Sequence, residues 1–140
     1  MTATVRCVDV DLAATRTALV AALEAQTYGG APLRVSPWFA DTFAPPCALV
    51  GAFSITFDDT SYQGLTTALV VVKLLAPAQA QRPAQLDLDE LQTAYVNALL
   101  ADRTLGAVVT DARPVRTVAT MFARGSQEFP AADCETLIVF

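Results

Sequence analysis

The sequence predicts an α+β fold in which a mixed, mainly antiparallel β-sheet of about four to five strands is flanked by two α-helices. Two segments carry apolar residues at helical spacing, and several others alternate with a period of two or are rich in β-branched residues. Their order along the chain predicts α-β-β-β-α-β-β. The length of 140 residues fits one domain, residues 1–140.

The first helix is predicted over residues 11–27. Asp9 or Asp11 is suited to accept the free amides of its first turn. Gly29 and Gly30, followed by Pro32, supply a stop. One side of the helix carries an apolar stripe formed by Leu12, Thr15, Leu19 and Leu23.

Three strands are expected next. Residues 33–36 form a short strand, and residues 37–46 form a loop rich in proline and aromatic side chains. Residues 47–57 alternate with a period of two, as a strand with one buried face does. Residues 58–64 have turn chemistry and lead into a central strand at residues 65–75. A helix is the competing interpretation for residues 65–75, but their valines and threonines favour extension.

The segment 76–84 contains two prolines and is predicted to be a connector or an arm. A second helix then continues to about Ala101, and Asp87 with Glu90 resembles a capping box at its start. Gly106 stands where a terminating glycine belongs.

Two strands are expected to complete the sheet. Residues 108–122 are predicted to be extended, with Pro114 marking an edge strand, a bulge or a bend. Residues 136–140 are predicted to form a short final strand.

The composition points toward self-association. Apolar residues make up 54% of the chain and charged residues only 16%, which leaves apolar side chains over once a core is filled. No uncharged run reaches the roughly 20 apolar residues that a membrane-spanning helix needs. Asp9 and Asp11 interrupt the place where a signal peptide has its apolar core.

The residue inventory disfavours several kinds of chemistry. The chain has no histidine, which removes the usual partner of a serine or cysteine nucleophile. Cys7, Cys47 and Cys134 are far apart and are expected to be free, buried thiols in a reducing compartment. The net charge is −5 and the nine basic residues are scattered, so tight nonspecific DNA binding is disfavoured. We expect no catalytic residue, no cofactor and no metal site.

Three aromatic residues of the proline-rich loop are candidates for a subunit or partner interface. Trp38, Phe39 and Phe43 lie outside any periodic element, so something other than strand or helix pairing must cover them. Packing over the sheet is one explanation. Docking on a neighbouring subunit is the other.

Charged residues supply further interface candidates: Asp58, Asp59, Arg82, Arg113, Arg116 and Arg124. The two adjacent aspartates suit a solvated turn, although paired carboxylates can also bind a cation or act in catalysis. The last three arginines fall on or near the bent strand, where they either protect an edge or form an ion pair between subunits.

Several stretches together resemble the tail terminator (tail completion) proteins of long-tailed, siphovirus-like bacteriophages. They are PCALV at 46–50, the hairpin from FDDT at 57–60 into 65–75, the helix running into LLADRTLG at 99–106, and the final strand at 135–140. The resemblance covers most of the chain. Each stretch taken alone is short.

The resemblance implies a ring, a hexamer in this family, that caps the tail tube and ends its polymerisation. The implied partners are further copies of the chain, the tail tube protein and the head-tail connector or a head-completion protein. DNA is implied only as cargo passing through the lumen, with no cofactor and no membrane. The implied location is the head-proximal end of the virion tail, after assembly in the host cytoplasm.

Other functions stay open at this point. Another neck, head-tail or minor tail protein shares this size and composition. From a different class, a small enzyme or ligand-binding domain could use carboxylates such as Asp58, Asp59 and Asp111. A soluble adaptor that regulates one partner is a third alternative.

Overall fold

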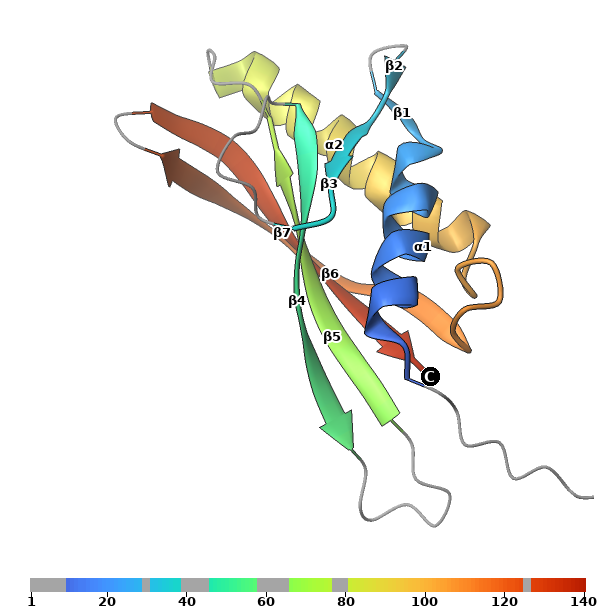
Figure 1. The fold of residues 1–140 in the computed structure, drawn as a ribbon. Helices are drawn as coiled ribbons and strands as arrows, with labels where there is room; N and C mark the ends of the chain where they lie inside the picture. The colour runs from blue at the N-terminus through green and yellow to red at the C-terminus, as the bar shows by residue number, and fades with distance from the viewer. Residues whose placement is uncertain (1–9, 29–30, 39–45, 58–65, 77–80, 125–126) are drawn as a thin grey trace, which may run out of the picture.

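The computed structural model of the protein describes residues 10–28, 31–38, 46–57, 66–76, 81–124 and 127–140. In this part of the chain, two helices cover one face of a five-stranded sheet, whose other face carries no helix (Figure 1). A separate two-stranded ladder lies near the end of the first helix. The predicted α+β fold class is confirmed.

The large sheet has the strand order β3-β4-β5-β7-β6. β3 pairs with β4 in parallel, and the other pairs are antiparallel, so the sheet is mixed and mainly antiparallel as predicted. With the two helices, its strands follow the predicted order along the chain. Their bounds are Arg34–Ser36 for β3, Cys47–Phe57 for β4, Thr66–Leu75 for β5, Asp111–Arg124 for β6 and Gln127–Val139 for β7.

Helix α1 spans Leu12–Glu24. Asp11 caps its N-terminus, where one carboxylate oxygen accepts from the Ala14 N–H at 3.0 Å. The helix ends earlier than predicted, because the chain turns into the small antiparallel ladder of β1 (Thr27–Tyr28) and β2 (Ala31–Pro32). This ladder was not predicted, because its two-residue strands are too short to show a period.

Helix α2 spans Gln81–Ala101, so the predicted connector over 76–84 is wrong for residues 81–84, which are helical, and the predicted capping box at Asp87 is wrong. Residues 77–80 lie outside the described residues. Pro83 falls in the first turn, where a proline loses no intrahelical hydrogen bond because the first N–H groups have no acceptor within the helix. Asp87 lies inside the helix instead. Burial, followed by a hydrogen bond with Asp87, raises the pKa of Tyr28.

A left-handed turn connects α2 to β6. Leu105, Gly106 and Ala107 have φ angles of 49°, 68° and 68°. A carboxylate oxygen of Asp102 accepts from the Gly106 N–H at 3.1 Å, and the Thr104 hydroxyl accepts from the Ala107 N–H at 3.2 Å. Gly106 therefore belongs to this turn, and α2 itself ends before it, at Ala101.

The two C-terminal strands are longer than predicted and form a long hairpin. The register of β6 shifts between Pro114 and Arg116, and β6 lies at the sheet edge, which confirms the prediction for Pro114. The prediction that the last strand begins at residue 136 is wrong, since β7 begins at Gln127. Pro130 fits within it because β5 ends there: the Ala76 N–H donates to the Pro130 carbonyl at 2.8 Å. Beyond that point, in the part of the chain that the structure describes, β6 and β7 pair only with each other.

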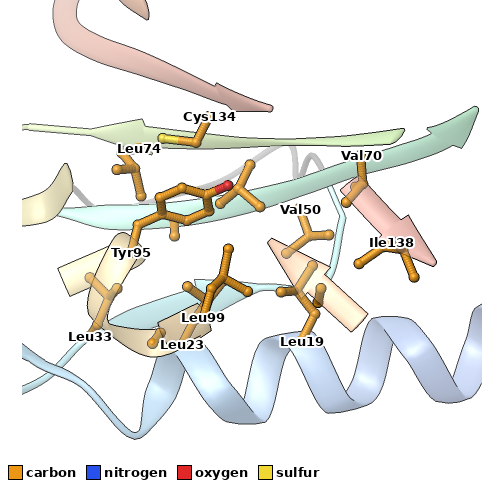
Figure 2. Packing of buried hydrophobic residues seen from close by; sticks show 14 of the residues in the cluster. Leu19, Leu23, Leu33, Val50, Val70, Leu74, Tyr95, Leu99, Cys134 and Ile138 are labelled. Atoms are coloured by element: carbon orange, nitrogen blue, oxygen red, sulfur yellow. The ribbon is translucent and has the colours of Figure 1, made fainter. Parts of the chain in front are cut away.

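The main core lies between the helices and the sheet (Figure 2). Its largest fully buried side chain, Tyr95, points from α2 toward the sheet. The Tyr95 hydroxyl lies 2.5 Å from the hydroxyl of Thr136 on β7, and it also donates to the Glu135 carbonyl at 3.3 Å. The aliphatic residues around it include Leu19, Leu23, Leu99, Val50, Val70, Leu74 and Ile138.

Cys47 and Cys134 are free and buried, as expected, whereas Cys7 lies outside the described residues. They lie on opposite faces of the sheet: Cys134 belongs to the main core and Cys47 to a smaller cluster on the helix-free face. Burial raises the pKa of Cys134 to about 12 and that of Cys47 to about 11.

The hydroxyl pair in the core predicts a measurable coupling. Tyr95→Phe should lower the free energy of unfolding by about 1–3 kcal/mol, because it leaves the buried Thr136 hydroxyl without this partner. The double variant with Thr136→Val should lose less than the sum of the two single losses. Urea unfolding of the three variants measures the coupling, and strict additivity would contradict it.

The left-handed turn predicts a stabilising substitution. Ala107→Gly should raise the free energy of unfolding by about 0.5–1 kcal/mol, because a left-handed conformation is strained for a residue with a Cβ atom. Ala21→Gly, at an exposed position within α1, is the matched control and should lower it by about 1 kcal/mol. Equal destabilisation by both glycines in thermal unfolding would refute the expected difference.

Candidate interaction surfaces

The helix-free face of the sheet carries a small apolar cluster at one end. Cys47, Leu49, Leu75 and Ala131 are buried there, and Phe122 of β6 packs against them. Lys73 lies with its ammonium 5.2 Å from the centre of the Phe122 ring. This end of the face is therefore closed by its own side chains.

Two ion pairs cross the same face. Lys73 Nζ lies 3.0 Å from an oxygen of Asp133, although the angles are not those of a hydrogen bond and this buried oxygen has no other partner in the described structure. Arg116 Nε lies 3.0 Å from an oxygen of Glu135. Both pairs join neighbouring strands of one chain, so the described acids and bases of this face largely neutralise each other.

The edge strand β6 exposes several large apolar side chains. Val115, Val118 and Met121 expose 56%, 40% and 55% of their surface, unusually high values for large apolar residues on one strand. Arg113 is exposed and lies opposite Leu137 on the same face as Arg116. Because Arg116 already pairs with Glu135 of its own chain, Arg113 is the more available cation of the two.

Trp38 lies at the opposite margin, two residues after the end of β3. It is 64% exposed, so packing over the sheet does not cover it. The Ser36 hydroxyl donates to the Trp38 carbonyl at 2.7 Å and fixes the local backbone. The exposed indole is available to a neighbouring molecule.

Arg16 of α1 supports the margin of the sheet beside Trp38, a role that was not predicted from the sequence. Its Nη1 donates to the Val50 carbonyl at 3.1 Å and also to the Pro37 carbonyl, while the guanidinium lies 4.9 Å from the centre of the Phe53 ring. Beside it is a surface hollow of about 280 Å³ lined by Arg16, Trp38, Val50, Gly51 and Ala52. A lone arginine on a helix gives no sequence signal for such contacts.

The remaining candidates are only partly placed. Phe39, Phe43, Asp58 and Asp59 lie outside the described residues. Arg82 lies in α2 and Arg124 in β6, but their side chains are outside what the structure describes. Trp38 therefore lies at one margin of the sheet, and Arg113 and Arg116 lie at the other.

Asp111, a carboxylate of the alternative enzyme hypothesis, has a structural partner. Its two oxygens accept from Arg103 Nε and Nη2 at 2.9 and 2.8 Å, a bidentate pair at the start of β6. The hydrogen bonding with Arg103 holds the pKa of Asp111 below its usual value. No group of three or more acidic, cysteine or histidine side chains within the described ranges is arranged to hold a metal ion.

Comparison with known proteins gives no assignment: no protein-family model matches the sequence, and no curated protein shows significant similarity to it. Neither described helix combines the length and apolar character needed to cross a membrane.

The contacts of Arg16 predict a stability loss. Arg16→Met keeps the apolar stem but removes the hydrogen bonds to two carbonyls, so the free energy of unfolding should fall by about 1–3 kcal/mol. Arg34→Met, at an exposed position on β3, is the control and should change it by less than about 0.5 kcal/mol. Denaturant unfolding followed by the fluorescence of the single tryptophan measures both. Equal effects would contradict the assigned role of Arg16.

Proposed function

We propose that the protein is a virion structural protein, a phage tail terminator whose copies form a ring. The ring caps the tail tube, ends its polymerisation and joins the tail to the head connector. The observation that carries the proposal is the placement of two different candidate surfaces, one around Trp38 and one along β6, at opposite margins of the sheet.

Opposite, unlike surfaces favour a ring over a simple dimer. A two-fold dimer uses the same patch on both copies, whereas a head-to-tail interface uses two different patches and closes when the rotation between copies allows it. Each copy can thus present its Trp38 margin to one neighbour and its β6 margin to the other. The high apolar content of the sequence and the exposed side chains of Val115 and Met121 can supply the buried apolar surface of such contacts.

The position in the virion rests on the sequence resemblance. That resemblance supplies the hexamer, the tail tube and head-connector partners, and the head-proximal location. DNA is only passing cargo in this proposal. The net charge of −5 disfavours sticking of the duplex, and the exposed Asp89 and Glu90 of α2 contribute to it.

Purified full-length protein tests the assembly step. Sedimentation and negative-stain electron microscopy should show rings of uniform size with a central opening. A strict monomer at high protein concentration would refute ring assembly.

Capping is tested by adding the rings to a polymerising tail tube protein, which a gene flanking this one is expected to encode. The tubes should stop growing and carry a ring at one end. Rings that leave tube length unchanged would refute the terminator role while keeping ring assembly.

A further inference from the structure

Within the described residues, the edge of β6 is protected over its first half only. The Ala112 N–H donates to the Arg103 carbonyl at 2.5 Å, Pro114 has no N–H to offer, and the strand bulges before Arg116. These are common devices that keep a sheet edge from pairing with another chain. The run 117–123 that follows contains no charge and no proline, and in the described part of the chain no strand pairs on its outer side.

The opposite edge has the same construction. β3 pairs with β4 only at Cys47–Leu49, and the next outward carbonyl, that of Val50, accepts from Arg16. The run 51–57 that follows is also free of charge and proline. No strand among the described residues pairs with its outer side.

Two hydrogen bonds fix which backbone groups face outward. The Ala76 N–H donates to the Pro130 carbonyl and the Phe140 N–H donates to the Thr66 carbonyl, so even-numbered residues of β7 face β5 and odd-numbered ones face β6. With the observed registers, residues 117, 119, 121 and 123 of β6 point their N–H and C=O groups outward. On β4, residues 53, 55 and 57 do the same.

Strand direction makes these two edges complementary. β4, β5, β7 and β6 alternate in direction across the sheet, so β6 of one copy beside β4 of another continues the alternation. The helices of both copies then lie on the same side. Alternation alone does not exclude β6 pairing with β6.

We infer that residues 117–123 of β6 pair antiparallel with residues 51–57 of β4 in a second copy of this chain, which joins the two sheets into one. Aligning the centres of the two runs places Ser54 opposite Thr120. The outward groups of Phe53 and Ile55 then meet those of Met121 and Ala119. The inference rests on the proposed ring and names the contact that holds it together.

Charge argues against the symmetric alternative. Pairing of residues 117–123 with the same run of another copy sets Arg116 opposite Arg124, once at each end of the run. Like charges directly opposite each other destabilise a strand pair. That arrangement also leaves both β4 edges unpaired, whereas the run 51–57 places no charge opposite β6.

The two open runs lie at opposite ends of the sheet, because each is the C-terminal half of its strand and the two strands run in opposite directions (Figure 1). Pairing therefore displaces each copy along the strand direction relative to its neighbour. A sheet that closes on itself needs such a stagger, with strands tilted to the axis.

Engineered disulfides test the contact and its symmetry. Ser54 and Thr120 face their own neighbouring strands, so across the interface they form a non-hydrogen-bonded pair with Cα atoms about 4.5 Å apart, within disulfide range. In a Cys7→Ser background, Ser54→Cys with Thr120→Cys should give a ladder of covalent species beyond the dimer on a non-reducing gel. Either substitution alone should give monomer.

Two outcomes would overturn the inference. Disulfide dimers of Thr120→Cys alone would show that β6 pairs with itself. A double variant that sediments as rings but does not cross-link would show that the ring uses another surface, and the proposed function would stand.

A third outcome separates the inference from the proposed function. If the variant gives the cross-linked ladder but its rings do not stop tube growth, the strand contact is supported and the terminator role is refuted.

A backbone variant adds an independent measurement. Ala119→Pro removes one outward N–H of β6 and should reduce the ring fraction in sedimentation at least tenfold while circular dichroism stays that of the folded chain. Ala119→Ser keeps the N–H and should assemble like the original protein. Equal assembly of both variants would contradict edge pairing.

Discussion

Covering a single sheet on one face only is the constraint on which the rest of the structure depends. The N–H and C=O groups of successive strand residues point alternately to the two sides of the strand, and a strand at the margin finds a partner strand on one side alone. The two helices bury the core face, but they cannot supply partners to β4 or β6 along their outer sides. The chain closes the first half of each margin with local devices, and among the described residues no strand pairs with the outer side of the second halves.

Much of the fold could be predicted from the sequence because the periodic segments are strong. The alternation in residues 47–57 and the valine-rich 65–75 gave strands within a residue of those observed. The prediction failed where the same residue type is compatible with two different local structures. A proline usually interrupts a helix, yet Pro83 lies in the first turn of α2.

The surfaces were harder to predict than the fold. Pro114 correctly marked an edge, because a missing N–H is a property of the residue itself. The role of Arg16 depends on two carbonyls that are distant in sequence and meet it only in the folded chain. The left-handed turn is carried by Leu105 and Ala107 as well as by Gly106, and neither of these two residues signals such a conformation in a sequence.

The part of the β6–β7 hairpin that extends past β5 has a further consequence. From Met121 opposite Pro130 onward, no third strand among the described residues pairs with the hairpin, although Phe122 packs on the small cluster of the helix-free face. Isolated two-stranded ribbons are marginal in water. Amide hydrogens there should exchange with solvent sooner than those near Thr136. A partner strand that pairs with this extension must also order it, so binding is coupled to local folding. The conformational entropy lost on ordering lowers the affinity.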